Sequence, residues 1–283
     1  MKTGMIFTCA ILALLCLYPA GAQAATYTVD RTDDSASATA CTGAGNDCSL
    51  RGAIIKANGD SSMDTIILPA GTYVLTRAGA FEDDADTGDL DILEDVRIQG
   101  PGACLTVIDG NGLDRVFDVG KEETIIESDK CTGVDRTYAH LELAGLTVTG
   151  GEPPLYNGGG EDHPFPDSDC RYDEQWTADG GGILVRGNNS QGSSSLTLEA
   201  VQVDSNKSRR DAGGIMAERY TTLTLTGSTI SRNESHTDGG GMLIDRRAVM
   251  TMTNCTVSGN RITNLGDGGG ICMQYVDNGN TMI

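Results

Sequence analysis

The sequence predicts an all-β protein with the architecture of a parallel β-helix, and three observations support this fold class. The segment 195–271 contains three copies of one unit, SLTLEAVQVDSN, TLTLTGSTISRN and VMTMTNCTVSGN, each followed by a polar link and then AGGI, GGGM or GGGI. Equivalent positions recur at one constant interval, as Asn206, Asn233 and Asn260 do, and a period of this length is typical of a solenoid. Apolar residues alternate with Thr and Ser inside each unit, which is the period of a strand. We therefore expect two short strands per unit, each stacked on the same strand of the next coil about 4.8 Å away.

The segment 1–24 has the pattern of a secretory signal peptide. Lys2 precedes a hydrophobic run over residues 5–18, and Ala22 and Ala24 supply the small residues of a cleavage site, which we expect after Ala24. The run is too short to cross a bilayer, and no later segment approaches the length of about 18 uninterrupted apolar residues that a spanning helix needs. The sequence therefore predicts a protein that is secreted or held at the outer cell surface, without a transmembrane helix.

The chain is strongly acidic. It has 20 basic and 40 acidic residues, a formal net charge of −20. Loss of Lys2 with the signal segment would make this charge slightly more negative. Such a charge disfavours nucleic acid and anionic membranes as partners and favours solubility or the binding of divalent cations. The 38 Gly residues and the low aromatic content of 5% suit a repetitive β architecture better than a helical enzyme.

Residues 25–76 are expected to form an N-terminal cap and a first coil. TYTVD predicts a strand, SLRGAIIKAN a short helix, and TIILPAGTYVLT a pair of strands. In the helix Leu50, Ala53, Ile54 and Ala57 recur at helical spacing, with Ser49 as the N-cap. One apolar face on a short helix suits a cap that covers the open end of a solenoid.

The segment CTGAGNDCSLRGAIIKAN, followed by TIILPAGTY, resembles the N-terminal CSLREA-type motif of secreted bacterial right-handed parallel β-helix proteins. GDLDILEDVRIQGPGACLTVIDGNGLDRVF and the GGGI repeats are also similar to that group, and loosely to the polymorphic outer membrane proteins. The resemblance implies export and a right-handed, pectin-lyase-like solenoid. Right-handedness is also the general preference of connections between parallel strands. One departure is Gly52, which stands where the motif has Glu and which should weaken the helix. The resemblance implies no catalytic residues.

Residues 77–283 are expected to form the β-helix itself. It contains an acidic stretch, FEDDADTGDLDILED over residues 81–95, for which a solvated loop and a calcium site are the two interpretations. An insertion over residues 151–179 interrupts the repeat and carries Tyr172 and the single Trp, Trp176. These aromatic residues either pack against the coil or stack on a sugar ring. The chain ends inside a unit at Ile283, so we expect the solenoid to be truncated there.

Seven cysteines follow the signal segment, and in an exported protein they are candidates for disulfides. Cys41 and Cys48 are separated by a short run of small, turn-forming residues and make the safest pair. Cys131 and Cys170 are a second pair, which would staple the insertion to the coil. No C-x-x-C pattern occurs, which argues against a zinc site.

Three columns of polar residues recur along the solenoid. The Asn column predicts a ladder of stacked amides at a tight corner. The Asp column, Asp179, Asp211, Asp238 and Asp267, suits either the capping of Gly-rich corners or calcium between the coils. The Arg column, Arg186, Arg219 and Arg246, suits either solvated ion pairs or contact with a carboxylated polysaccharide.

Two functions from different classes fit this pattern. The first is a non-catalytic extracellular scaffold that presents loops for adhesion or for binding an extracellular or cell-surface polysaccharide. The alternative is a calcium-dependent polysaccharide lyase, in which Arg219 or Arg246 would abstract a proton. A β-helix can carry either function, so the site has to decide between them.

Overall fold

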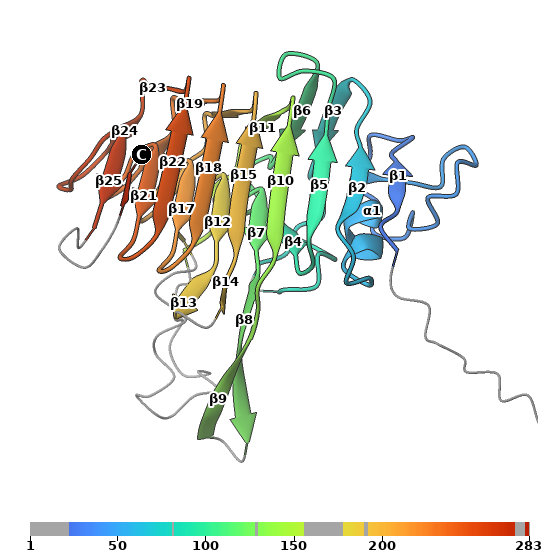
Figure 1. Cartoon of the computed structure of the whole chain (residues 1–283), viewed down its shortest axis with the longest axis horizontal. Coiled ribbons are helices and arrows are strands. Elements are labelled where there is room, and N and C mark those ends of the chain that lie inside the picture. The colour runs from blue at the N-terminus through green and yellow to red at the C-terminus, as the bar shows by residue number, and fades with distance from the viewer. Residues whose placement is uncertain are drawn as a thin grey trace, which may run out of the picture.

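The computed structural model describes residues 23–80, 82–127, 130–155, 178–189, 192–274 and 281–282, with side chains omitted for part of 122–135, for 188–189 and for 281–282. The chain forms a right-handed parallel β-helix with one short helix near the N-terminus (Figure 1). Three all-parallel sheets run along the coil. Among the described residues no helix is both long enough and apolar enough to cross a membrane.

The first sheet has eight strands, the second six and the third six. In spatial order the first sheet holds β1 (Thr26–Thr28), β2 (Asp64–Ile67), β5 (Val96–Gln99), β10 (His140–Ala144), β15 (Ser195–Glu199), β18 (Thr222–Thr226), β22 (Val249–Thr253) and β26 (Thr281–Met282). The second holds β3 (Gly71–Val74), β6 (Thr106–Asp109), β11 (Thr147–Thr149), β16 (Gln202–Asp204), β19 (Thr229–Ser231) and β23 (Thr256–Ser258). The third holds β4 (Leu90–Ile92), β7 (Phe117–Val119), β12 (Ile183–Val185), β17 (Ile215–Ala217), β21 (Met242–Ile244) and β25 (Ile271–Met273).

Each coil therefore has three strands, whereas the repeat predicted two. The third strand begins directly after the Gly-rich corner, as β12 and β21 do, and is only three residues long. Such a strand is too short to show an alternation in the sequence. The predicted register is correct, since Leu196 and Leu198 of β15 pair with Leu223 and Leu225 of β18, one period later.

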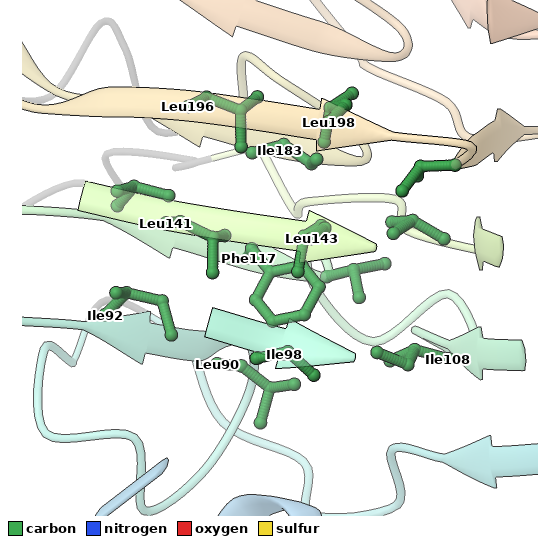
Figure 2. Close-up of a cluster of buried hydrophobic side chains, with 14 of the residues drawn as sticks. Leu90, Ile92, Ile98, Ile108, Phe117, Leu141, Leu143, Ile183, Leu196 and Leu198 are labelled. Carbon is green, nitrogen blue, oxygen red and sulfur yellow. The ribbon is translucent and has the colours of Figure 1, made fainter. Parts of the chain in front are cut away.

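The interior of the coil is filled by one apolar side chain above another. In the close-up, Ile98, Leu143 and Leu198 of the first sheet face Leu90, Phe117 and Ile183 of the third (Figure 2). All six side chains are fully buried. Each fully buried side chain of this size contributes about 1.5–3 kcal/mol by leaving water, so these stacked columns hold the coils together.

The predicted cap is confirmed. Helix α1 (Leu50–Ala57) begins after Ser49, whose hydroxyl accepts a hydrogen bond from the Gly52 amide at 2.9 Å. Leu50, Ala53, Ile54 and Ala57 pack into the main hydrophobic core at the end of the coil. A side chain at position 52 would meet the carbonyl oxygen of Ala38 at 2.1 Å, so this close approach of backbone accounts for Gly52.

The cap also holds the predicted disulfide between Cys41 and Cys48. The second predicted pair, Cys131 with Cys170, lies outside the described residues. Thiols of Cys104, Cys255 and Cys272 are unpaired in the part of the chain that the structure describes.

The remaining strands form hairpins or bridges outside the three sheets. β8 (Lys121–Glu127) and β9 (Lys130–Thr137) make an antiparallel two-stranded arm, and β13 (Gly187–Asn189) pairs with β14 (Gly192–Ser193) in a shorter hairpin. β20 (Glu234–Ser235) and β24 (Arg261–Ile262) are parallel neighbours at a corner. The β8–β9 arm extends away from the coil (Figure 1).

Candidate functional site

The outer face of the third sheet changes character along the solenoid. In its later coils the central, outward position of each strand is apolar and buried beneath the Gly-rich corners, as at Leu184, Met216, Leu243 and Cys272. In the first two coils the same position is Asp91 in β4 and Asp118 in β7, which are register partners. Both are buried. The outward position of the third sheet is therefore occupied by buried carboxyl groups in the first two coils and by a small apolar core in the later coils.

A third carboxyl group joins this pair. Oxygen atoms of Asp89, Asp91 and Asp118 all lie within 4.8 Å of one another. Two arginines face them: Arg115 Nη1 lies 2.6 Å from Asp118 Oδ2 and 3.3 Å from Asp89 Oδ2. One edge of the Arg186 guanidinium binds both oxygens of Asp118: Nε donates to Oδ1 at 2.9 Å and Nη2 donates to Oδ2 at 2.7 Å. Because these guanidinium groups already supply positive charge, we interpret the cluster as a buried ion-pair network.

Burial dominates the electrostatics of this network. It raises the pKa of Asp89 well above its usual range, and the neighbouring Asp114 adds to the effect. Burial also raises the pKa of Asp91, with Asp89 as the next cause. For Arg115 and Arg186 burial acts to lower the pKa, but attraction to Asp118 and its neighbours outweighs it, so both pKa values are raised. The arginines therefore stay charged while the carboxyls compete for protons.

The acidic stretch that precedes β4 exposes Asp84 and Asp86 to solvent, as one interpretation of the sequence predicted, but its backbone is anchored to the coil. It wraps around the buried guanidinium of Arg51, which donates hydrogen bonds to the carbonyl oxygens of Ala85, Thr87, Gly88 and Asp89 at 2.8–3.2 Å. Asp34 balances its charge, with 2.5 Å between Arg51 Nε and Asp34 Oδ1. Helix α1 thus holds the loop against the coil, and the loop delivers Asp89 and Asp91 to the network.

The predicted Asp column forms a ladder of hydrogen bonds. Asp179 Oδ1 accepts from the Asp211 amide at 2.9 Å, Asp211 Oδ1 from the Asp238 amide at 2.9 Å, and Asp238 Oδ1 from the Asp267 amide at 2.7 Å. The first three carboxylates of the column therefore each cap the Gly-rich corner of the next coil. A calcium ion between the coils would compete with these amides for the same oxygens. Burial raises the pKa of Asp179 to about 8.

The predicted Arg column is paired with acids of the same and neighbouring coils. Arg186 lies in the network described above. Arg219 Nε is 3.3 Å from Asp245 Oδ2, and Arg246 Nε is 3.8 Å from Asp245 Oδ1. The two arginines of the alternative lyase hypothesis thus share one carboxylate. Tyr172 and Trp176, the predicted sugar-stacking residues, lie outside the described residues.

One spacing in the sequence points to this network, although the repeat units at 195–271 do not contain it. Asp91 and Asp118 are separated by one full period of the solenoid, the same interval that separates Asn206 from Asn233. The first two coils deviate from the repeat sequence, and the third strand of each coil was not expected. Arg186 gave no such signal, because the β8–β9 arm and the insertion over 151–179 together place it 68 residues after Asp118.

Comparison of the chain with models of known families, with curated proteins and with solved structures found no match.

Proposed function

We propose that the protein is a secreted or cell-surface scaffold, without catalytic activity, whose coil displays projecting segments that bind an extracellular or cell-surface polysaccharide. Export is supported by the signal-like segment 1–24 and by the resemblance of residues 41–58 to the CSLREA-type motif. The proposal that the coil displays binding segments is supported by the way in which the β8–β9 arm joins the coil.

The observation that carries the proposal is the undisturbed register on both sides of the β8–β9 arm. Strand β10 pairs in register with β5 of the preceding coil and with β15 of the following coil. The whole arm is inserted between β7 and β10 without shifting either pairing. A segment that the coil does not need for its own packing is suited to interaction, and rigid scaffolds commonly carry their binding groups on such segments.

The next coil contributes a second projection at the same corner. The β13–β14 hairpin follows β12 just as the arm follows β7. A side chain at Gly192 would meet the ring of Tyr138 at 2.4 Å, so the hairpin lies directly against the base of the arm. The Ser193 hydroxyl donates to the Tyr220 carbonyl at 2.9 Å, which ties the hairpin to the following coil. The two projections are therefore presented together.

The alternative function, a calcium-dependent polysaccharide lyase, receives less support. In that function Arg219 or Arg246 would have to turn from its acidic partner toward the substrate. Asp245 lies beside both side chains. Arginines that are paired with a carboxylate of the coil suit a structural role, and this favours the scaffold over the enzyme.

Removal of the arm tests the proposal. In the variant, residues 121–137 are replaced by a short Gly-Ser link between Gly120 and Tyr138, and retention on a panel of neutral and uronate-containing polysaccharides is compared with the parent. We expect the unmodified protein to be retained by at least one polysaccharide and the variant to lose that retention while keeping its unfolding temperature. A second variant with a shortened β13–β14 hairpin measures the share of the other projection, and it should also retain less polysaccharide than the parent does. Equal retention of parent and arm variant contradicts the proposal.

The same panel separates the two functions. A lyase produces unsaturated sugars that absorb in the ultraviolet, only with calcium, and loses this activity in the variants Arg219→Ala and Arg246→Ala. We expect no such product. Its appearance overturns the scaffold proposal in favour of the lyase.

A further inference from the structure

The buried network joins three successive coils through their charged side chains. Asp89 and Asp91 belong to the first of these coils, Arg115 and Asp118 to the second, and Arg186 follows the third strand of the next coil. Arg186 also lies 3.9 Å from Glu218 of the coil after that. The network is therefore the place where the charge state of the protein can alter how the first coils are held together.

The network contains more buried acid than base. Four carboxyl groups, those of Asp89, Asp91, Asp114 and Asp118, are buried, and among the described side chains the cations in contact with them are Arg115 and Arg186. If all four carboxyls were ionised, two negative charges would remain uncompensated away from water, and such burial is costly. Protons held on some of these groups would remove this cost.

We propose that the network is a pH-sensitive latch. Protons shared among its buried carboxyls keep the segment 82–91 and strand β7 packed on the coil, and loss of these protons as the pH rises releases the segment and the strand. The latch does not depend on the polysaccharide-binding function.

Among the side chains that the structure describes, charged groups act on the latch from each segment that meets there, including Arg51 of α1, which donates to the Asp89 carbonyl at 2.8 Å. Glu82, Asp83 and Asp89 come from the loop before β4, Asp91 from β4, Asp114 and Arg115 from the turn before β7, Asp118 from β7, Lys121 from the start of β8, Arg186 from the residue after β12, and Glu218 from the residue after β17. The acids predominate, so each proton lost makes the next loss less favourable.

The direction of the response follows from the pKa shifts. Burial, followed by Asp118, raises the pKa of Asp83 to about 6. Burial also raises the pKa values of Asp89, Asp91 and Asp114. A carboxyl whose pKa is higher in the folded than in the unfolded state stabilises the fold most below the unfolded value, about 4, and that contribution is lost as the pH rises through the folded value. The closed latch is therefore most stable in acid at about pH 4, and it weakens as the pH rises through about 6, the pKa of Asp83, and on through the raised pKa values of Asp89 and Asp91.

The arm begins beside the latch. Gly120, which links Val119 of β7 to Lys121 of β8, has a positive φ of 94°, and a Cβ there would lie 3.1 Å from the Cβ of Arg186. Opening of the latch would thus loosen the base of the arm as well as the loop that holds Asp89.

The variant Asp91→Asn tests the latch. An asparagine keeps an oxygen that can accept the Ala85 amide, which now donates to Asp91 Oδ2 at 2.7 Å, and its own amide takes the place of a protonated carboxyl. We expect it to match the wild type at pH 5 and to exceed the wild-type unfolding temperature by about 2–4 °C at pH 8. Asp118→Asn, which takes the charged partner from both arginines, should lower the unfolding temperature at both pH values.

Asp204→Asn is the matched control, because Asp204 is paired with Arg232 on the outer face of the second sheet, away from the network. It should leave the pH dependence as in the wild type. If Asp91→Asn and the wild type lose stability in parallel from pH 5 to pH 8, the latch is wrong.

Hydrogen exchange of the wild-type protein gives a test that needs no variant. After correction for the intrinsic rate, peptides covering 82–92 and 116–121 should exchange about tenfold faster at pH 8 than at pH 5.5, while β21, whose outer residue is Leu243, should not change. Equal protection of all these peptides at the two pH values overturns the proposal.

Discussion

Asn233 Oδ1 accepts hydrogen bonds from both nitrogen atoms of Asn206, from the backbone amide at 3.0 Å and from Nδ2 at 3.1 Å. The same relationship joins Asn260 to Asn233, at 2.9 Å and 3.0 Å. Each amide group also donates to a backbone carbonyl, that of Val203 in the case of Asn233. The side chains of Asn206 and Asn233 are fully buried. This ladder satisfies buried backbone groups at the corner that follows the second sheet.

Replacing Asn233 by Leu should destabilise the protein by about 2–4 kcal/mol. The substitution leaves the Asn206 amide and the Val203 carbonyl buried without their partner, and each such loss costs about 1–3 kcal/mol. Denaturant unfolding measures the change. Asn264→Leu, at an exposed position, is the control and should cost little. Equal stability of the two variants would show that the ladder is not needed.

The Asn ladder was predictable from the sequence because its members recur at the full repeat period inside the most regular coils. The buried network was not predicted, for two physical reasons. Asp91 and Asp118 occupy strands of three residues, in which no alternation can be recognised. Arg186 reaches Asp118 because the β8–β9 arm and the insertion over 151–179 both leave the register of the third sheet intact. Periodicity reveals residues that stack at constant spacing, and it does not reveal partners that an insertion separates.

Arg51 should be irreplaceable even by lysine. Its planar guanidinium binds Asp34 and four backbone carbonyls at once, in a site where the side chains of both ions are at most 1% exposed. A lysine offers three donors at a single point and cannot reproduce this fork. We expect Arg51→Lys to cost about 3–5 kcal/mol, since buried carbonyls and Asp34 would lose partners.

Thermal unfolding of Arg51→Lys beside Arg77→Lys checks this prediction. Arg77 also pairs with an aspartate, Asp86, at 3.3 Å, but its side chain is 38% exposed, so its replacement should cost less than about 1 kcal/mol. Similar losses for the two variants would contradict the role assigned to the buried guanidinium.

Reduction of the Cys41–Cys48 disulfide should destabilise the cap. Closing a loop across a separation of seven residues lowers the entropy of the unfolded chain by an amount worth about 2.5 kcal/mol. The double variant Cys41→Ser with Cys48→Ser should therefore unfold at a lower temperature than the oxidised parent, and reductant should lower the parent to the same value. If reductant lowers the unfolding temperature of the double variant as well, another disulfide contributes.

The Asp ladder allows capping and calcium binding to be told apart. Asp238 Oδ1 accepts the Asp267 amide at 2.7 Å, and Oδ2 accepts from Gln274 Nε2 at 3.1 Å. An asparagine can accept the first of these bonds through its own oxygen, whereas an alanine can accept neither. If capping is the role of the column, Asp238→Asn should unfold close to the wild type and Asp238→Ala should lose about 1–2 kcal/mol.

Calcium binding makes a different prediction for the same pair of variants. A cation between the coils needs the negative charge of the column, so calcium would raise the unfolding temperature of the wild type, and Asp238→Asn would lose that increase as fully as Asp238→Ala. Unfolding of all three proteins is measured with calcium and with a chelator. We expect the chelator to change none of them, because one oxygen of Asp179, of Asp211 and of Asp238 already accepts a backbone amide along the column. A calcium-dependent increase confined to the wild type would instead assign the column to a metal ion.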